Sequence, residues 1–544
     1  MSQISQDVDQ VNSAAASSIA IHPQPGGPMS HRQIMETLAG LLTGMFVAIL
    51  SSTIVTNALP TIISDLHSGQ TAYSWVITST LLAMTVTTPI WGKLSDLVDK
   101  KLLVQISLVI FVVGSIIAGL AANAGQLIAA RAIQGVGAGG MTALTQTILA
   151  VMVSPRERGR YGGYMGGLFA VGTVVGPLVG GAIVDTSWLG WRWCFFIGVP
   201  IAAIALVVLQ KTMRLPMVKR QTKVDWLGAL LVAAATSVLL IWVSFAGDKY
   251  AWLSWQTGVM IGGTVVLGAL FLLTESKTSE PIIPLHLFGN RTIVLAVAGS
   301  LAAGVAMYSG TTFLSQFFQL ARDESPTAAG LLTLPMIFGL AVISIVSGRL
   351  IARTGRWKIV LVVGSVLTVA GVTALGTVRA DTPYGLLAVY MFCVGAGVGM
   401  TMQNLVVAVQ NQVRIHEIGA ASATVAFMRS LGGAIGVSAL GAIMANRITD
   451  YTETGLAGLG VGGSGTHSGS SLPTLSTLSA PVRSVVEDAF GHGIADAFLC
   501  TAPLALLALI AVLFIREVPL RTTVGPDPAV DAAAARTDGK VGHS

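Results

Sequence analysis

Charge is scarce in this sequence: only 10% of its 544 residues are Asp, Glu, Lys or Arg, whereas 53% are hydrophobic. A soluble domain carries about 25% charged residues. The low charge and the mean hydropathy of +0.75 therefore exclude an ordinary soluble protein and predict an integral membrane protein in contact with the lipid bilayer. The formal net charge of +6 does not indicate a nucleic-acid partner, because the basic residues lie in short turns between apolar segments.

Other absences exclude whole classes of site. The three cysteines, Cys194, Cys393 and Cys500, lie in apolar segments at unrelated spacings, which favours small buried thiols over a disulfide or metal framework. No phosphate-binding loop, paired-histidine metalloprotease helix or serine nucleophile turn occurs. The glycine-rich run Gly135–Gly140 fits a dinucleotide pattern but lies inside a long apolar helix, where it indicates helix packing. We therefore expect no enzyme activity, no metal site and no cofactor.

Long apolar runs make up most of the chain. A bilayer core of about 30 Å requires roughly 20 apolar residues per helix, and about fourteen runs satisfy this length. The sequence thus predicts an all-α integral membrane fold whose spanning helices lie near residues 37–59, 72–92, 102–123, 126–153, 160–184, 193–213, 226–246, 256–274, 292–319, 328–350, 358–378, 384–409, 419–446 and 494–516.

The basic residues sort to one side of these runs. If the N-terminus lies on the inner side of the membrane, the tails and the inner turns hold about 23 of the 31 Lys and Arg residues. Because such residues are retained on the cytoplasmic side, we expect both termini there and place the protein in the cell membrane. Residues 1–34 are expected to form a disordered cytoplasmic tail and residues 517–544 a second cytoplasmic tail. Residues 449–490, rich in Gly, Ser and Thr, are expected to form a long outer loop.

An internal repeat divides the chain. The turn Gly92–Lys101 (GKLSDLVDKK) shares its glycine, leucine and basic positions with Gly348–Lys358 (GRLIARTGRWK). The glycine-rich runs Gly135–Met141 and Gly395–Met400 form a second pair. Parallel halves of this kind place a substrate site at their interface, near the membrane midplane. We expect two pseudo-symmetric six-helix bundles, one at residues 35–213 and the other at residues 292–516. Two inserted helices, at residues 214–291, are expected between them.

Several motifs, in order, resemble those of the major facilitator superfamily. The turn Gly92–Lys101 looks like its motif A, Leu127–Gly135 resembles motif B, and Gly172–Gly181 resembles motif C, which is typical of antiporters. The segments Thr53–Pro60 and Trp191–Pro200 are similar to the fourteen-helix drug:proton antiporter family of the EmrB/QacA type. The resemblance covers roughly residues 35–520. It implies a transporter that works by alternating access between two halves.

The third of these motifs has its own physical interpretation. Gly172, Gly176 and Gly180 are spaced by four and share one helix face, which allows another backbone to approach closely. Pro177 removes a backbone donor and bends the helix, and Gly181 completes the pattern. Ordinary packing of small residues is an equally good explanation. The resemblance implies instead that the kink seals the outer half of the bundle.

Three charged residues stand out. Arg131 lies inside an apolar run, where an arginine costs roughly 2.5–3.5 kcal/mol at the helix centre. We expect it to face the bundle interior and to modulate a proton-carrying group or hold substrate, with a snorkelling side chain as the alternative. Arg429 is as consistent with a structural role as with a functional one. Asp96 lies at the end of its helix, where the helix dipole disfavours a negative charge. The resemblance implies that it contacts the start of the thirteenth predicted helix, near Glu417–Ala420, and latches an inner gate. The alternative is a solvated turn residue.

The acid that would carry a proton is not identified by the sequence. The resembling family usually has an acid in helix one where this chain has Ser51, and no acid lies near the middle of any predicted helix. Asp185 and Asp496 near outer helix ends, and Asp96 itself, are the candidates. A proton carrier requires a carboxyl group whose pKa is raised by burial, and none of the three is preferred.

The predicted function follows from the resemblance. We expect a monomeric, proton-driven antiporter that exports small hydrophobic, cationic or amphipathic drugs, as in multidrug efflux and antibiotic resistance. The alternatives are an exporter of one endogenous lipid, antibiotic or metabolite, and a non-transporting membrane sensor of the same fold. Polar and aromatic residues that could line a hydrophobic substrate cavity, with lipid-facing positions as the alternative, are Asn57, Trp75, Gln134, Tyr308, Phe313, Gln316, Phe317, Gln403 and Asn404.

Overall fold

The fold is helical throughout the part of the chain that the computed structural model describes, namely residues 31–68, 70–186, 188–213, 224–247, 249–278, 280–458 and 479–521, and these residues contain no strand. The first group of helices is α2 (His31–Asp65), α3 (Gln70–Leu97), α4 (Lys100–Gly119), α5 (Ala124–Met152), α6 (Pro155–Asp185), α7 (Trp193–Phe196) and α8 (Gly198–Thr212). Two further helices follow, α9 (Trp226–Phe245) and α10 (Trp255–Glu275). The last group is η1 (Leu285–Gly289), α11 (Arg291–Gln316), η2 (Phe317–Ala321), α12 (Pro326–Leu332), α13 (Leu334–Thr354), α14 (Trp357–Leu375), α15 (Tyr384–Gln410), η3 (Ile415–Glu417), α16 (Ile418–Gly458) and α17 (Ala480–Phe514).

Thirteen helical segments of the described chain are long and apolar enough to cross a membrane. They correspond to thirteen of the fourteen predicted spans. The remaining span corresponds to α3, which is less apolar because it carries Lys93, Asp96 and many hydroxyl side chains but packs within the same bundle. The prediction of an all-α integral membrane fold is confirmed.

Polar residues at the expected places fix where helices begin and end. The first backbone N–H groups of a helix lack partners within it, and short polar side chains accept from them. Asp99 accepts from the backbone N–H of Lys101 at the start of α4, and Asn123 accepts from that of Gln126 at the start of α5, both at 2.9 Å. Gly355 ends α13 with a φ of 73°, a left-handed conformation that glycine adopts without cost.

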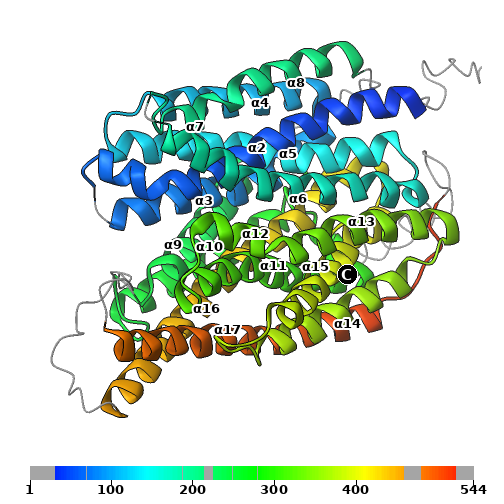
Figure 1. Ribbon diagram of the computed structural model, residues 1–544. Coiled ribbons are helices and arrows are strands. Elements are labelled where there is room, and N and C mark those ends of the chain that lie inside the picture. The colour runs from blue at the N-terminus through cyan, green and yellow to red at the C-terminus, as the bar shows by residue number, and fades with distance from the viewer. Residues whose placement is uncertain are drawn as a thin grey trace, which may run out of the picture.

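The helices pack as two bundles, each around its own apolar core. One core joins α2, α4, α5, α6 and α8, and another joins α11, α13, α14, α15 and α17. Figure 1 shows the first bundle in blue to cyan above the second in green to red. The inserted helix α9 packs against both α3 and α16, so the inserted pair lies where the two bundles meet.

Both ends of the described chain lie at the same end of the bundle. The ring of His31, the first described residue, lies 2.8 Å from the hydroxyl of Tyr161 in α6. The backbone N–H of Arg156 in α6 donates to the carbonyl of Arg521, the last described residue. The turns between α3 and α4 and between α13 and α14 lie here too, and we call this the basic end of the molecule.

One predicted boundary is wrong. Residues 449–458 and 480–490, expected to belong to a long loop, are helical and extend α16 and α17. The two extensions pack on each other, since Val485 lies against Gly455. This packing outweighs the weak helix propensity of the segment. Residues 459–478, in the middle of the predicted loop, lie outside the described residues, as do residues 1–30 and 522–544 of the predicted tails.

Candidate functional site

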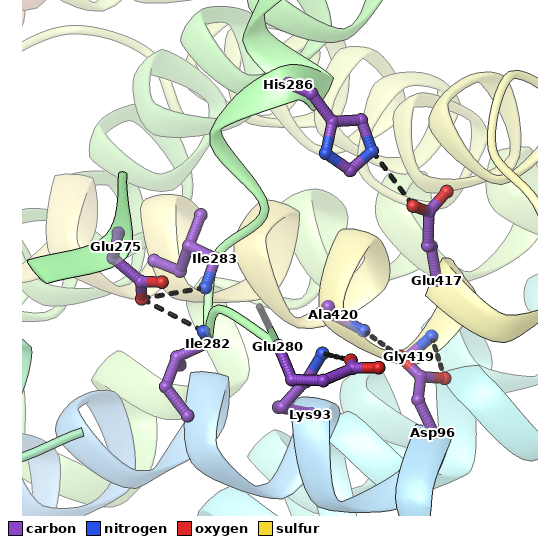
Figure 2. A network of polar contacts seen from close by, with 10 residues as sticks. All are labelled: Lys93, Asp96, Glu275, Glu280, Ile282, Ile283, His286, Glu417, Gly419 and Ala420. Carbon is purple, nitrogen blue, oxygen red and sulfur yellow. Dashed lines mark hydrogen bonds and ion pairs between the residues drawn. The ribbon is translucent and has the colours of Figure 1, made fainter. Parts of the chain in front are cut away.

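Asp96 joins the two bundles at the basic end. It lies in the last turn of α3 and is buried. Its carboxylate accepts hydrogen bonds from the backbone N–H groups of Gly419 (2.9 Å) and Ala420 (2.8 Å) at the start of α16, as Figure 2 shows. These N–H groups lack helical partners and carry a partial positive charge. The contact lies where the resemblance placed it, whereas the role of Asp96 as a gate latch stays a prediction.

Glycines allow this approach. A Cβ atom at Gly92 of α3 would collide with Ala423 and lie 2.7 Å from the carbonyl oxygen of Gly419. A Cβ atom at Gly419 would lie 2.5 Å from Asp96 Oδ1. The backbones of α3 and α16 therefore touch, and the carboxylate reaches the helix start because no side chain intervenes.

A second crossing joins the bundles at the same end, between α6 and α13. Gly159 and Gly348 face each other, and a Cβ atom at Gly348 would collide with the Gly159 carbonyl. Arg156 Nε donates to the carbonyl of Ala352 (3.1 Å), and its Nη2 donates to that of Arg353 (3.0 Å). Arg156 is not among the predicted site residues, because a basic residue in a turn indicates topology.

A third contact between the bundles uses a buried arginine. Arg158 of α6 donates from Nη1 to the side-chain oxygen of Gln410 in α15 (3.2 Å) and from Nε to the Val153 carbonyl (2.9 Å). Arg158 carried no signal of its own in the sequence, because it falls in the predicted turn between the spans 126–153 and 160–184. With the two crossings, this contact closes the basic end between the bundles.

The segment between α10 and α11 contacts both helices of the first crossing. Lys93 of α3, one turn before Asp96, forms a partly buried ion pair with Glu280 (2.7 Å). His286 Nε2 lies 2.9 Å from a carboxylate oxygen of Glu417, directly before α16. A cavity of about 410 Å³ lies between these groups (Figure 2). The sequence analysis interpreted this segment as an ordinary turn.

The predicted residue Arg131 is buried within the first bundle. Its Nη1 donates to the side-chain oxygen of Gln134 (2.9 Å), whose amide nitrogen donates to Ser115 of α4 (2.7 Å). Arg131 Nε lies 3.5 Å from the Val76 carbonyl of α3. Its side chain is 3% exposed, so it faces the bundle interior and does not snorkel. Its role in proton coupling, and that of Gln134 in a substrate cavity, stay predictions.

Arg429 is the second buried arginine at the level of the membrane. It lies on α16 beside Tyr308 of α11, and it is buried. Its Nη1 atom has no hydrogen-bond partner among the described residues. A buried guanidinium group with an unused donor is costly, which fits a ligand-contacting role better than a packing role. That role stays a prediction.

The glycines of the third motif pack within the first bundle. Gly172, Gly176 and Gly180 of α6 face Ile49, Thr53 and Ile54 of α2 in that order. Thr53 also donates from its hydroxyl to the Gly172 carbonyl (3.2 Å). The expected close approach of another backbone is therefore present. Gly181 is partly buried on the same helix, and the side chain of Pro177 lies outside the described residues.

The candidate acids near the opposite end differ in what the structure describes. Asp496 of α17 accepts a hydrogen bond from the Tyr451 hydroxyl (3.0 Å) and pairs with Arg447 (3.6 Å) on α16. It therefore ties two helices of the second bundle together. The side chain of Asp185 lies outside the described residues. Neither residue is singled out as a proton carrier.

The proposed substrate-cavity residues are not brought together in one place. Phe313 and Phe317 belong to the core of the second bundle, and Trp75 stacks on Phe245 of α9 with ring centroids 4.9 Å apart. Gln403 and Asn404 of α15 face Gly162 and Gly159 of α6, between the bundles. None of the described ones among these nine residues lines the cavity of about 410 Å³ at the basic end. Their roles stay predictions, and the side chain of Asn57 lies outside the described residues.

Comparison with known structures shows the same arrangement of helices. The chain superimposes on the proton:xylose symporter XylE with a TM-score of 0.62 at 14% identity, covering 93% of this chain and 100% of that one. It superimposes on the human organic anion transporter MFSD10 with a TM-score of 0.59, also at 14% identity, covering 88% and 99% respectively. These likenesses show the fold alone.

Comparison of sequences extends the likeness to function. An uncharacterized MFS-type transporter of Mycobacterium tuberculosis is 36% identical over 91% of this chain and 71% of its own. The multidrug transporter protein MdtP of Bacillus subtilis is 31% identical over 78% of each chain. The efflux pump dotC of Dothistroma septosporum is 31% identical over 93% of this chain and 87% of its own. The family model of the Major Facilitator Superfamily matches residues 41–437. The chain belongs to the Major Facilitator Superfamily and is a multi-pass membrane transporter, not an enzyme.

Proposed function

We propose that this transporter is a fourteen-helix drug:proton antiporter that exports hydrophobic or amphipathic compounds, with its basic end in the cytoplasm. The observation that carries this proposal is the Asp96 contact, in which a carboxylate of one bundle holds the start of a helix of the other. Alternating access requires contacts between the halves that form at one end and break when the transporter reverses. A few hydrogen bonds to N–H groups that lack helical acceptors meet that requirement better than a permanent apolar contact.

The direction of transport and the breadth of substrates rest on the relatives. Two of them carry the names multidrug transporter and efflux pump. The positive-inside bias supports a cytoplasmic basic end, and in an alternating-access cycle closure of that end belongs to the outward-open state. Arg131 and Arg429 are buried arginines within candidate membrane spans of the described chain. They favour neutral or amphipathic substrates over strongly cationic ones within the predicted range.

Transport by purified protein in liposomes tests the proposal. An imposed pH gradient should drive accumulation of several chemically unrelated dyes or drugs, and each substrate should dissipate the gradient as it moves. Arg131→Ala should abolish this exchange while the protein remains in the membrane. Gradient-independent movement, or none, would contradict proton antiport. Transport of a single compound out of a broad panel would favour an exporter of one endogenous lipid, antibiotic or metabolite.

A further inference from the structure

A pair of buried carboxylates lies at the ends of the inserted helices α9 and α10. Asp225 caps the start of α9, and its Oδ1 accepts from the backbone N–H of Gly228 (2.8 Å). Glu275 ends α10, and its Oε1 accepts from the backbone N–H groups of Ile282 (3.0 Å) and Ile283 (3.2 Å). The two residues are only 9% and 3% exposed.

Each carboxylate keeps one oxygen without a partner. Asp225 Oδ2 and Glu275 Oε2 are buried, and neither has a hydrogen bond in the described structure. A Cβ atom at Gly228 would collide with Asp225 Oδ2 and lie 3.4 Å from Glu275 Oε1, so the two groups approach the same point. Two close buried carboxylates cannot both stay ionised without a compensating charge. A single proton removes one charge and supplies a donor for a free oxygen.

We propose that Glu275, beside the carboxylate of Asp225, binds one proton, and that this proton holds the basic end closed. The inference rests on the proposed function only in treating that end as a gate that opens. Glu275 anchors the backbone at Ile282 and Ile283, directly after Glu280, which pairs with Lys93 on α3. Loss of the proton leaves two repelling carboxylates. Glu275 then leaves its backbone donors, and Glu280 loses the support that aims it at Lys93.

The cavity of about 410 Å³ beside this pair gives the proton a route. Glu275 lies at its wall together with Asp96, so the cavity adjoins both the pair and the first crossing. Because the closed state binds one more proton than the open state, rising pH destabilises closure. The other titratable or charged groups that face this region are Lys93, Glu280, His286, Arg414, His416 and Glu417.

Hydrogen exchange of the full chain in lipid nanodiscs, without substrate or gradient, tests the proposal. The protection of the Ile282 and Ile283 amides, corrected for intrinsic exchange, should fall about tenfold between about pH 5.5 and pH 8.5. Glu275→Gln and Asp225→Asn should keep high protection at both pH values, because each neutral amide retains an acceptor oxygen and removes a charge. Glu453→Gln, an exposed residue of α16, is the matched control and should keep the wild-type pH dependence.

Two further variants and one ion separate the possible causes. His286→Gln should also keep the pH dependence, which assigns it to the carboxylates and not to the histidine. Equal wild-type protection at both pH values would overturn the proposal, as would unchanged pH dependence in both carboxylate variants. If protection changed with the Na⁺ concentration at constant pH, the carboxylates would bind a metal cation in place of the proton. That result would also overturn the proposal. If hydrogen exchange showed the expected pattern but the liposome transport assay failed, only the antiport function would be contradicted.

Discussion

The two crossings at the basic end come from equivalent parts of the repeat but are held by opposite charges. At the first, Asp96 at the end of α3 accepts from N–H groups at the start of α16. At the second, Arg156 near the start of α6 donates to carbonyl groups at the end of α13. The glycines Gly92 and Gly348 occupy the same place in the two copies. The backbone geometry is therefore shared, and the polar chemistry is not.

The difference follows from where the partner helix begins. Helix α16 begins at Ile418, so the N–H groups of Gly419 and Ala420 fall in its first turn and lack helical acceptors. Helix α6 begins at Pro155, a full turn before Gly159, so the N–H groups near that glycine are already bonded within the helix. The free polar groups at the second crossing are the last carbonyls of α13, and these need a donor.

The opposite charges respond differently to protons. A carboxylate loses its charge when it binds a proton, whereas a guanidinium group stays charged in proteins. The first crossing also carries the attached segment with Lys93, Glu280 and Glu275. We infer that the first crossing is the one that solution conditions can loosen and that the second acts as a fixed contact.

Substitution of the glycines should have the largest effect at both crossings. Gly348→Ala and Gly92→Ala each place a methyl group against the backbone of the opposite helix. Overpacking of this kind costs about 1–3 kcal/mol, and backbone atoms cannot rotate away. We expect a lower melting temperature in detergent and loss of the closed basic end by hydrogen exchange.

Gly258 provides the control for these variants. It lies on α10 with open space around it, so Gly258→Ala should gain the roughly 0.5–1 kcal/mol of helix propensity that alanine has over glycine. A Gly348→Ala variant that melts like this control would show that the second crossing does not depend on backbone contact.

Asp96→Asn should have the next largest effect, confined to the first crossing. Hydrogen bonds to a charged group contribute about 1.5–3 kcal/mol, and the neutral amide keeps an acceptor oxygen but not the charge. Protection of the Gly419 and Ala420 amides should fall about tenfold, which corresponds to about 1.4 kcal/mol. The amides at the start of α6 should not change.

Asp99→Asn, three residues away, is the matched control. Asp99 caps α4 through the backbone N–H of Lys101, and Asn caps a helix about as well as Asp. It should therefore leave both crossings intact. If both variants lost protection equally, the cause would be the removal of a negative charge anywhere at the basic end. That result would contradict a specific role for Asp96.

Some of this arrangement could be predicted from the sequence. Fourteen apolar runs predicted the helices, and the repeat of Gly92–Lys101 at Gly348–Lys358 predicted two related halves. Asp96 stood out because its helix dipole disfavours it, and the resemblance supplied its partner. These features are local in the chain or repeat within it.

The rest depends on contacts between distant segments. Asp225 and Glu275 look like ordinary residues at helix ends, and only their burial and the approach at Gly228 distinguish them. Arg156 looked like a topology signal, since the same basic side chain can satisfy the positive-inside bias and cap α13. The extensions of α16 and α17 were missed because Gly, Ser and Thr favour loops until two such helices pack on each other.

Ala352→Asp, which copies the carboxylate of the first crossing into the second, should have the smallest effect. Ala352 stands where the first copy has Asp96, but the start of α6 offers no free N–H group there, so the new carboxylate can only pair with Arg156. A partly exposed pair of this kind contributes about 0–1 kcal/mol. The melting temperature should change little, and the variant should not restore closure in Asp96→Asn protein. If Ala352→Asp stabilised the protein by as much as Asp96→Asn destabilises it, the position of the helix start would not decide whether an acidic or a basic side chain holds a crossing.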